Sequence, residues 1–325
     1  MTREVFGSKL KALLGDRLVF PAGANFASLA AETSDAEQSQ TNEAFSDKWG
    51  RYDQSPEKQG LYEMQKRWYL DLYGFGTEAE LARFLKGRGV IFDAGCGLGY
   101  KAAWFAELSP ESLVVGIDFS DAARQAAQNY SDLPNLFFIR GDIAQTPFPD
   151  GGIDYVSCDQ VIMHTQNPDL TFAELTRITT ESGGEFACYF YRKKALPREL
   201  LDDHFRSRCI EMGSQELWEM SEQLTELGKR LSELNVSFDA PDIPALGIKG
   251  GRYDIQRFLY WNFIKCFWSE ELGPETSVVT NYDWYSPSNA RRYSKEEVLG
   301  LVEQHRLKIE HFHEEEACYS GRFAR

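Results

Sequence analysis

Residues 90–105 read VIFDAGCGLGYKAAWF, an apolar run followed by a turn with three glycines and then by a helix-like segment. Glycine has no Cβ, so a backbone built this way can adopt left-handed conformations and lie close to a neighbouring group. A strand, a glycine turn and a helix in this order are typical of sheets that bind nucleotides. The turn lacks the lysine of a P-loop, and Tyr100 stands where the G-x-G-x-x-G dinucleotide pattern has its third glycine. The pattern present is D-x-G-x-G-x-G.

Four further apolar runs follow at a regular spacing, and helix-like segments separate them. The runs cover residues 113–117, 136–139, 153–158 and 185–191. Such continuous apolar runs are typical of strands buried in a parallel sheet, with crossover helices on both faces. The middle of the chain therefore predicts an α/β fold with a doubly wound sheet.

Acidic residues follow the next two strands of this alternation. Asp118 ends the run LVVGID, where a carboxylate can accept the hydroxyl protons of a ribose. The triplet Gly141-Asp142-Ile143 follows the next run and suits an adenine, whose amino group needs an acceptor and whose ring needs apolar neighbours. The glycine turn, Asp118 and this triplet therefore follow one another along the chain as the parts of a single adenosine pocket would.

The segments DAGCGLGY, GIDFS, GDIAQTPFPDGGIDYV and VIMHT together resemble the successive motifs of class I S-adenosylmethionine-dependent methyltransferases. The resemblance implies a Rossmann-like sheet of seven strands, with S-adenosyl-L-methionine as the cofactor and S-adenosyl-L-homocysteine as its product. By matching position it also implies the cofactor contacts, which are Asp93, Gly95, Cys96 and Gly97 for the methionine portion, Asp118 for the ribose, and Phe119, Asp142 and Ile143 for the adenine.

Two segments outside this core, KWGRYDQ and NYDWYSP, are similar to segments of one small-molecule branch of these methyltransferases. Many members of that branch begin with a zinc ribbon, but no cysteine precedes Cys96 here. The resemblance to the branch therefore says less about the substrate than the core motifs say about the cofactor.

Methyl transfer is a displacement at a sulfonium carbon, so the protein mainly aligns the acceptor and excludes water. The predicted catalytic base is His164, which follows the fourth core strand where the family often carries a histidine facing the methyl group. The alternative is a structural role as a helix cap or packed ring. A hydroxyl or protonated amine needs a base, whereas a thioether does not. Gln160 and Met163 share the loop, and we expect them to contact the cofactor and the substrate, respectively.

The alternation stops for residues 192–290, which contain a leucine stripe from Leu217 to Leu234 and then an aromatic-rich stretch. We expect the stripe to pack within the molecule, with a dimer seam as the alternative. An α-helical insertion after the fifth strand predicts a lid at the carboxyl ends of the strands, where open α/β sheets bind ligands.

The predicted domains are an N-terminal arm, partly disordered, at 1–47, helices covering the cofactor at 48–87, the cofactor-binding core at 88–191, the substrate lid at 192–290, and the last helix with a C-terminal strand pair at 291–325.

Aromatic residues outside the core are further candidates. We expect Trp49 and Tyr52 to close over the cofactor, and ordinary helix–sheet packing is the alternative. Trp284 and Tyr285 are expected to contact the substrate, because aromatic rings hold flat groups or face a cationic product. Most other aromatic residues of the insertion are expected in its core.

Positive residues near the predicted active edge are the candidates for binding an acidic substrate. Arg192 follows the fifth strand and Arg291 follows the aromatic stretch. In an acidic protein such residues favour a carboxylate or phosphate on the substrate, and solvated surface charge is the alternative. The segment HFHEEE places His311 and His313 on one face of a strand at a spacing that can bind a metal, but the reaction requires none and we predict no metal site.

The amino-acid composition limits the classes of molecule that the chain is expected to bind. The chain has 35 Lys and Arg against 50 Asp and Glu, a net charge of −15, which disfavours a nucleic-acid substrate. Its six cysteines show no C-x-x-C pair, which indicates reduced thiols in the cytoplasm. No run reaches the roughly 18 apolar residues of a membrane span, and charges interrupt the first 20 residues where a signal peptide would be apolar. We predict a cytoplasmic monomer or homodimer with a small-molecule substrate and no membrane partner.

These observations together predict an enzyme that transfers a methyl group to O, N or S of a small metabolite or biosynthetic intermediate, an acidic or amine-bearing one. A methyltransferase of tRNA or protein and a non-catalytic regulatory protein that binds S-adenosylmethionine remain as alternatives. An NAD or nucleotide-sugar enzyme on a similar sheet is a further alternative, against which Tyr100 and the Gly141-Asp142-Ile143 triplet count.

Overall fold

A computed structural model describes residues 1–29, 35–53 and 55–325 and divides the chain into two compact units. The first unit comprises Met1–Asp35, Met64–Tyr191 and Arg291–Arg325, and the second comprises Ala36–Glu63 and Arg192–Ala290. Of the predicted N-terminal arm, residues 30–34 lie outside the described residues.

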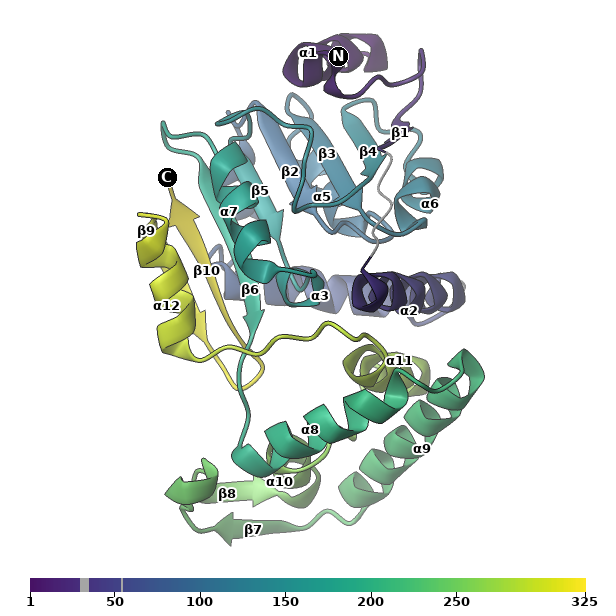
Figure 1. Cartoon of the computed structure of the whole chain (residues 1–325), viewed down its shortest axis with the longest axis vertical. Helices are drawn as coiled ribbons and strands as arrows, with labels where there is room; N and C mark the ends of the chain where they lie inside the picture. Colours follow the sequence, from purple (N-terminus) through teal and green to yellow (C-terminus); the bar gives the residue numbers. More distant parts are fainter. Residues whose placement is uncertain (30–34, 54) are drawn as a thin grey trace. The chain divides into compact units, whose positions relative to one another are not determined.

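One mostly parallel sheet forms the centre of the first unit (Figure 1). In the described part of the chain it has eight strands in the order β1-β4-β3-β2-β5-β6-β10-β9. The strands are β1 (Phe26–Ser28), β2 (Val90–Ala94), β3 (Leu113–Asp118), β4 (Leu136–Arg140), β5 (Tyr155–Cys158), β6 (Glu185–Tyr191), β9 (Lys308–Glu314) and β10 (Cys318–Ala324). The order reverses at β2, with β3 and β4 on one side and β5 and β6 on the other. The predicted doubly wound α/β fold is confirmed.

The sheet differs from the seven-stranded prediction by the short strand β1. Phe26 of β1 pairs in parallel register with Phe138 of β4, and strands β1 to β6 all run parallel. Strand β10 is antiparallel to both β6 and β9. The addition of β1 was not evident from the sequence, because three residues are too few to show an apolar pattern.

Helices complete the first unit. They are α1 (Arg3–Leu14), α4 (Glu78–Leu85), α5 (Tyr100–Leu108), α6 (Ala122–Asn129), α7 (Pro168–Ile178) and α12 (Lys295–Gln304), together with most of α3 (Lys58–Leu72). Ser294 is the N-cap of α12, since Ser294 Oγ accepts from the backbone N–H of Glu297 at 3.3 Å and Glu297 accepts from Ser294 N at 2.6 Å. The central strands are almost wholly buried, which explains their continuous apolar runs.

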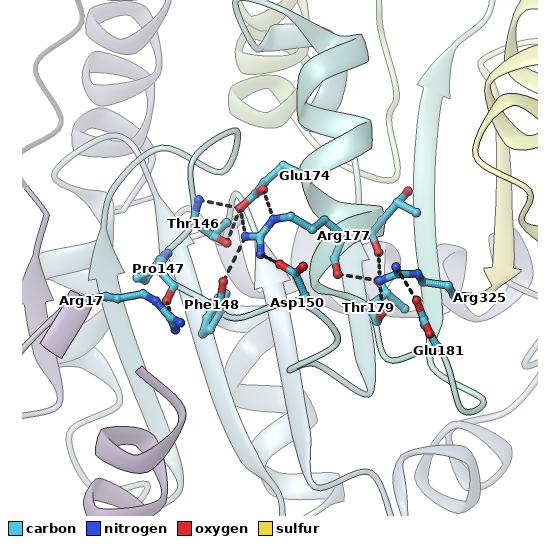
Figure 2. Close-up of polar contacts among 11 residues, drawn as sticks. Arg17, Thr146, Pro147, Phe148, Asp150, Glu174, Arg177, Thr179, Glu181 and Arg325 are labelled. Carbon is cyan, nitrogen blue, oxygen red and sulfur yellow. Dashed lines mark hydrogen bonds and ion pairs between the residues drawn. The ribbon is translucent and has the colours of Figure 1, made fainter. Parts of the chain in front are cut away.

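A polar cluster fastens the loop after β4 to helix α7 (Figure 2). Arg177 of α7 forms ion pairs with Glu174 and Asp150 and donates to the Phe148 carbonyl at 3.0 Å. Glu174 Oε1 in turn accepts from the backbone N–H and the hydroxyl of Thr146 at 2.9 and 2.6 Å. These bonds hold the loop that begins with the Asp142 segment.

The C-terminal residue Arg325 caps the carboxyl end of the same helix. Arg325 donates to the carbonyl oxygens of Thr176, Arg177 and Thr179 at 3.1, 2.6 and 2.9 Å, and it pairs with Glu181 at 2.9 Å (Figure 2). A cation at the carboxyl end of a helix satisfies its last carbonyl groups and complements the helix dipole.

The second unit is mainly helical. Its elements are α2 (Ala36–Tyr52), the first turns of α3, α8 (Leu196–Cys209), α9 (Ser214–Glu233), α10 (Ile255–Asn262), α11 (Pro274–Tyr285) and an antiparallel pair of strands, β7 (Ser237–Ala240) and β8 (Gly251–Asp254). None of the helices in the described parts of the chain is long and apolar enough to cross a membrane.

Helix α2 corrects the expectation of a partly disordered arm over residues 36–47. Its side chains are held by residues far along the chain: Asp47 accepts from Ser214 Oγ at 2.6 Å, from Trp218 Nε1 at 2.8 Å and from Tyr282 Oη at 2.9 Å. The segment is polar, and for that reason its sequence suggested a disordered arm. The contacts that order it come from residues remote in the sequence. The predicted boundary between residues 47 and 48 falls inside this helix.

The leucine stripe of α9 is only partly the buried face that we predicted. Leu217 is 5% exposed, but Leu227 is 42% and Leu234 59% exposed, and the other buried positions include Ser221, Thr225 and Gly228. A Cβ at Gly228 would lie 2.3 Å from the Cys266 carbonyl oxygen. Backbone segments this close leave room only for small side chains, which is why Gly228 occupies part of the buried face.

Candidate functional site

The turn after β2 has a left-handed backbone at each of its three glycines. The φ angles of Gly95, Gly97 and Gly99 are 77°, 50° and 83°, a region that residues with a Cβ seldom adopt. A Cβ on Gly95 would lie 2.4 Å from the Val161 side chain, and one on Gly99 would lie 2.7 Å from Ala126 Cβ. At these two positions the missing side chain makes room for the loop after β5 and for helix α6.

A carboxylate at the end of β3 holds the same turn. Asp118 Oδ2 accepts from the backbone N–H of Gly97 at 2.8 Å, and Asp118 Oδ1 accepts from Ser120 N at 2.9 Å and from Ser120 Oγ at 2.6 Å. The glycine turn and the predicted ribose ligand are therefore in direct contact. Asp118 stays half-buried at the carboxyl edge of the sheet, where two neighbouring parallel strands end.

Beneath the turn lies a buried charge cluster that was not foreseen. Lys101 Nζ, in the first turn of α5, lies 2.9 Å from Asp159 Oδ2 and 3.7 Å from Asp93 Oδ1. Asp159 Oδ1 also accepts from Tyr73 Oη at 2.9 Å. A lysine in the first turn of a helix opposes the helix dipole, and this unused signal in the sequence is the one that could have indicated a nearby carboxylate.

Burial governs the protonation of this cluster. It raises the pKa of Asp93 to about 6, with the positive charge of Lys101 acting in the opposite direction. For Lys101 burial lowers the pKa, but the carboxylates of Asp159 and Asp93 outweigh it and the net shift is upward. Neither carboxylate oxygen of Asp93 accepts a full hydrogen bond from a described residue. Asp93 is one of the residues predicted to contact the methionine portion. Its side chain is completely buried beneath the glycine turn and is not exposed at the surface of the turn.

The predicted adenine residues stand at the ends of β3 and β4. The backbone N–H of Gly141 donates to the Asp118 carbonyl at 3.0 Å, which brings the two strand ends together. Asp142 Oδ1 accepts from Ala144 N at 2.8 Å; burial raises the pKa of this carboxyl, and that hydrogen bond opposes the shift. Ile143 is buried and Phe119 half-buried. An acidic group and apolar side chains are thus placed next to Asp118.

The loop after β5 carries the three remaining predictions for the core. Gln160 has a φ of 63° and donates to Asp159 Oδ2 at 3.4 Å, so a strained residue joins this loop to the buried cluster. Met163 is fully buried. His164 ends a short 3-10 turn and is 6% exposed, with its ring edge-on to Tyr191 at 5.5 Å between ring centroids. The histidine is a packed residue at the carboxyl edge of the sheet.

The other predicted residues are not brought to the turn by contacts within the first unit. Arg291 belongs to this unit, where it pairs with Asp169 at 2.9 Å. Five predicted residues belong to the second unit: Trp49, Tyr52, Arg192, Trp284 and Tyr285.

Two of those five are buried, Trp284 at 6% and Tyr285 at 1% exposed. Trp49 is half-buried with the Lys48 ammonium 4.3 Å from the centre of its ring.

The histidine pair of β9 does not form a metal site. His313 Nε2 lies 3.2 Å from a Glu315 carboxylate oxygen, and the His311 ring packs against Gly74. In the described ranges no group of three or more His, Cys, Asp or Glu side chains is arranged to hold a metal ion.

Residues 92–188 match the family model of a methyltransferase domain. The matched segment covers less than half of the chain. It begins within β2 and ends within β6, so the domain contains the glycine turn, Asp118, Asp142 and the loop after β5. The match supports the predicted resemblance of this segment to methyltransferases.

Several curated methyltransferases are similar to parts of the chain. An uncharacterized methyltransferase of Schizosaccharomyces pombe is 33% identical over 117 residues, which are 33% of this chain and 42% of that protein. Sterol 24-C-methyltransferase erg6 of Aspergillus fumigatus is 26% identical over 275 residues, 72% of each chain. Demethylmenaquinone methyltransferase of Listeria welshimeri is 29% identical over 133 residues, 39% of this chain and 56% of that one. The chain thus spans only part of the length of these relatives.

Two solved structures illustrate the breadth of similar folds. An S-adenosylmethionine-dependent methyltransferase from Mesorhizobium loti is 14% identical with a TM-score of 0.46, covering 75% of this chain and 96% of that one. Magnesium protoporphyrin IX methyltransferase from Synechocystis, with bound SAH, is 14% identical with a TM-score of 0.45, covering 88% and 97%. Both scores are too low to support a conclusion about this chain.

Proposed function

We propose that the chain is an S-adenosylmethionine-dependent methyltransferase that acts on O, N or S of a small, acidic or amine-bearing metabolite. The observation that carries the proposal is the bond from Gly97 N to Asp118 Oδ2, 2.8 Å long, inside a methyltransferase domain. It unites the glycine turn with a carboxylate at the carboxyl edge of the sheet, where open α/β sheets bind nucleotides.

The residues at this edge fit the cofactor. The half-buried Asp118 carboxylate would accept from the ribose hydroxyls, because a carboxylate offers about four acceptor positions. Asp142, Ile143 and Phe119 would surround the adenine. The buried cluster below the turn has two carboxylates and one ammonium, so its net charge is negative when Asp93 is ionised, which favours a cationic methionine portion above it. The cofactor supplies the methyl group from its sulfonium centre.

The chain's own residues would then position the acceptor and exclude water. His164 would take the proton of a hydroxyl or protonated amine during transfer, and a thioether acceptor would leave it without a proton to accept. Met163, which is fully buried, would keep water from this side of the reacting groups. That the sterol and menaquinone relatives are named for small-molecule substrates supports the same class of acceptor.

The test is calorimetric binding of S-adenosylhomocysteine to the full chain and to Asp118→Ala. We expect binding to the wild type and a loss of about 10- to 100-fold in affinity for the variant, the effect of removing hydrogen bonds to a charged acceptor. Asp121→Asn is the matched control, because its carboxylate lies three residues further on and is 69% exposed. No heat with the wild type, or equal affinity in Asp118→Ala, would refute the proposal.

A further inference from the structure

Buried positive charge outweighs buried negative charge in one part of the second unit. Arg198 of α8 and Lys265, in the loop after α10, are 1% and 7% exposed. The buried carboxylate among them, Asp202, is already engaged on both oxygens: Oδ2 accepts from Arg198 Nε at 2.7 Å and Oδ1 from Tyr285 Oη at 2.9 Å. Arg198 also donates to the carbonyl of Tyr260. Arg198 is therefore paired, and Asp202 has its ion-pair partner.

Lys265 has no such partner. Its ammonium donates to Tyr260 Oη at 3.0 Å, and no carboxylate in the described ranges lies within 4 Å of it. The ammonium instead lies 4.9 Å from the ring centre of Trp284, 5.1 Å from that of Tyr260 and 5.8 Å from that of Phe267. An ammonium has three N–H donors, and rings satisfy it only in part. A buried charge without a counter-ion destabilises a fold, so its presence calls for another explanation.

Two further observations show that the excess of positive charge is local. Arg257 of α10 lies with its guanidinium carbon 5.6 Å from the ring centres of both Tyr260 and Phe267. Burial raises the pKa of the Cys266 thiol, and the charges of Arg198, Lys265 and Arg257 act against that shift. The three cations thus surround one short segment of aromatic residues, with Asp202 as the buried carboxylate beside them.

We propose that Lys265, supported by Arg198 and Arg257, binds an anionic group, a carboxylate or a phosphate, on a molecule whose planar part contacts the neighbouring rings. The anion supplies the counter-ion that the Lys265 ammonium lacks. The binding of an aryl anion by Lys265 does not depend on the proposed function.

The experiment measures binding of 4-fluorobenzoate and 4-fluorophenyl phosphate to the full chain by fluorine NMR, with 4-fluorobenzyl alcohol as the neutral reference. The two anions distinguish a carboxylate from a phosphate ligand. Lys265→Met removes the charge, Lys265→Arg keeps it, and Lys249→Met is the control at an exposed lysine of the same unit. Calorimetry with S-adenosylhomocysteine on every variant tests the cofactor site separately.

We expect the wild type to bind at least one of the two anions and not the alcohol, and Lys265→Met to weaken that binding by roughly tenfold or more, the contribution of one charge-assisted hydrogen bond. Lys265→Arg, Lys249→Met and all S-adenosylhomocysteine affinities should change little. The thermal midpoint of ligand-free Lys265→Met should equal or exceed that of the wild type, because an unpaired buried charge has been removed. Failure of both anions to bind, undiminished binding in Lys265→Met, or a lowered midpoint of that variant would each overturn the proposal.

Discussion

The Lys101 ammonium lies 2.9 Å from the Asp159 carboxylate, and this buried ion pair underlies the glycine turn. Lys101 begins helix α5 directly after the turn, and Asp159 begins the loop that carries Gln160 and His164. Two segments predicted to contact the cofactor are therefore joined through a pair of charges that water hardly reaches. Changes at this pair should affect stability and cofactor binding together.

Replacing Lys101 by Met should lower the free energy of unfolding by about 3–5 kcal/mol, because it leaves the carboxylates of Asp93 and Asp159 buried without a cation. Urea unfolding followed by circular dichroism measures the change. Lys86→Met, at an exposed lysine just before β2, is the control and should change it little. A loss for Lys101→Met no larger than for the control would mean that the pair does not stabilise the fold.

The raised pKa of Asp93 predicts a particular pH dependence. The folded pKa, about 6, exceeds the unfolded value of 3.8, so the folded state binds the proton more tightly between these values. The wild type should therefore lose stability as the pH rises from about 4 to 7, up to about 3 kcal/mol from this group.

The Asp93→Asn variant lacks this titration. Urea unfolding of both proteins at several pH values should give a stability difference that moves in favour of the variant as the pH rises. A difference that stays constant across this range would contradict the assignment of the titration to Asp93.

Gly95→Ala should destabilise the protein more than Gly76→Ala. Both glycines have positive φ, 77° and 68°, so each substitution carries the backbone penalty of about 1–2 kcal/mol. Open space surrounds Gly76, whereas a Cβ at Gly95 would meet Val161 at 2.4 Å. Thermal unfolding compares the two variants, and Val161→Ala in the Gly95→Ala background should restore part of the loss. Equal costs for the two glycine variants would show that the contact with Val161 does not matter.

His164→Asn should lower kcat by about 100-fold or more if the acceptor is a hydroxyl or amine, the usual contribution of a general base. The pH profile of the rate, measured by transfer of a labelled methyl group, would also lose the limb that reports the titration of the base. His305→Asn, at a half-buried histidine of the same unit, should leave the profile unchanged. An unaltered rate and profile in His164→Asn would assign the ring to packing against Tyr191.

The strand–turn–helix segments were predictable because their signals are local. Each strand from β2 to β6 is a continuous apolar run, and the glycines and acidic residues at the strand ends lie within a few positions of it. The contact between Gly97 and Asp118 follows from the same logic, since parallel neighbouring strands end at one edge. Helix α2 was missed and the buried face of α9 was predicted only in part, because both depend on partners far along the chain, such as Tyr282 and Cys266.

Local sequence was thus sufficient for the doubly wound sheet and for the resemblance to methyltransferases, since periodicity and turn residues act between near neighbours, and the cofactor contacts stay predictions. The pairing of Lys101 with Asp159, 58 positions away, and the isolation of the Lys265 ammonium among rings arose only when distant segments packed together. A charge carries no mark in the sequence of which groups will surround it, and in a buried site those surroundings set its pKa and its need for a partner.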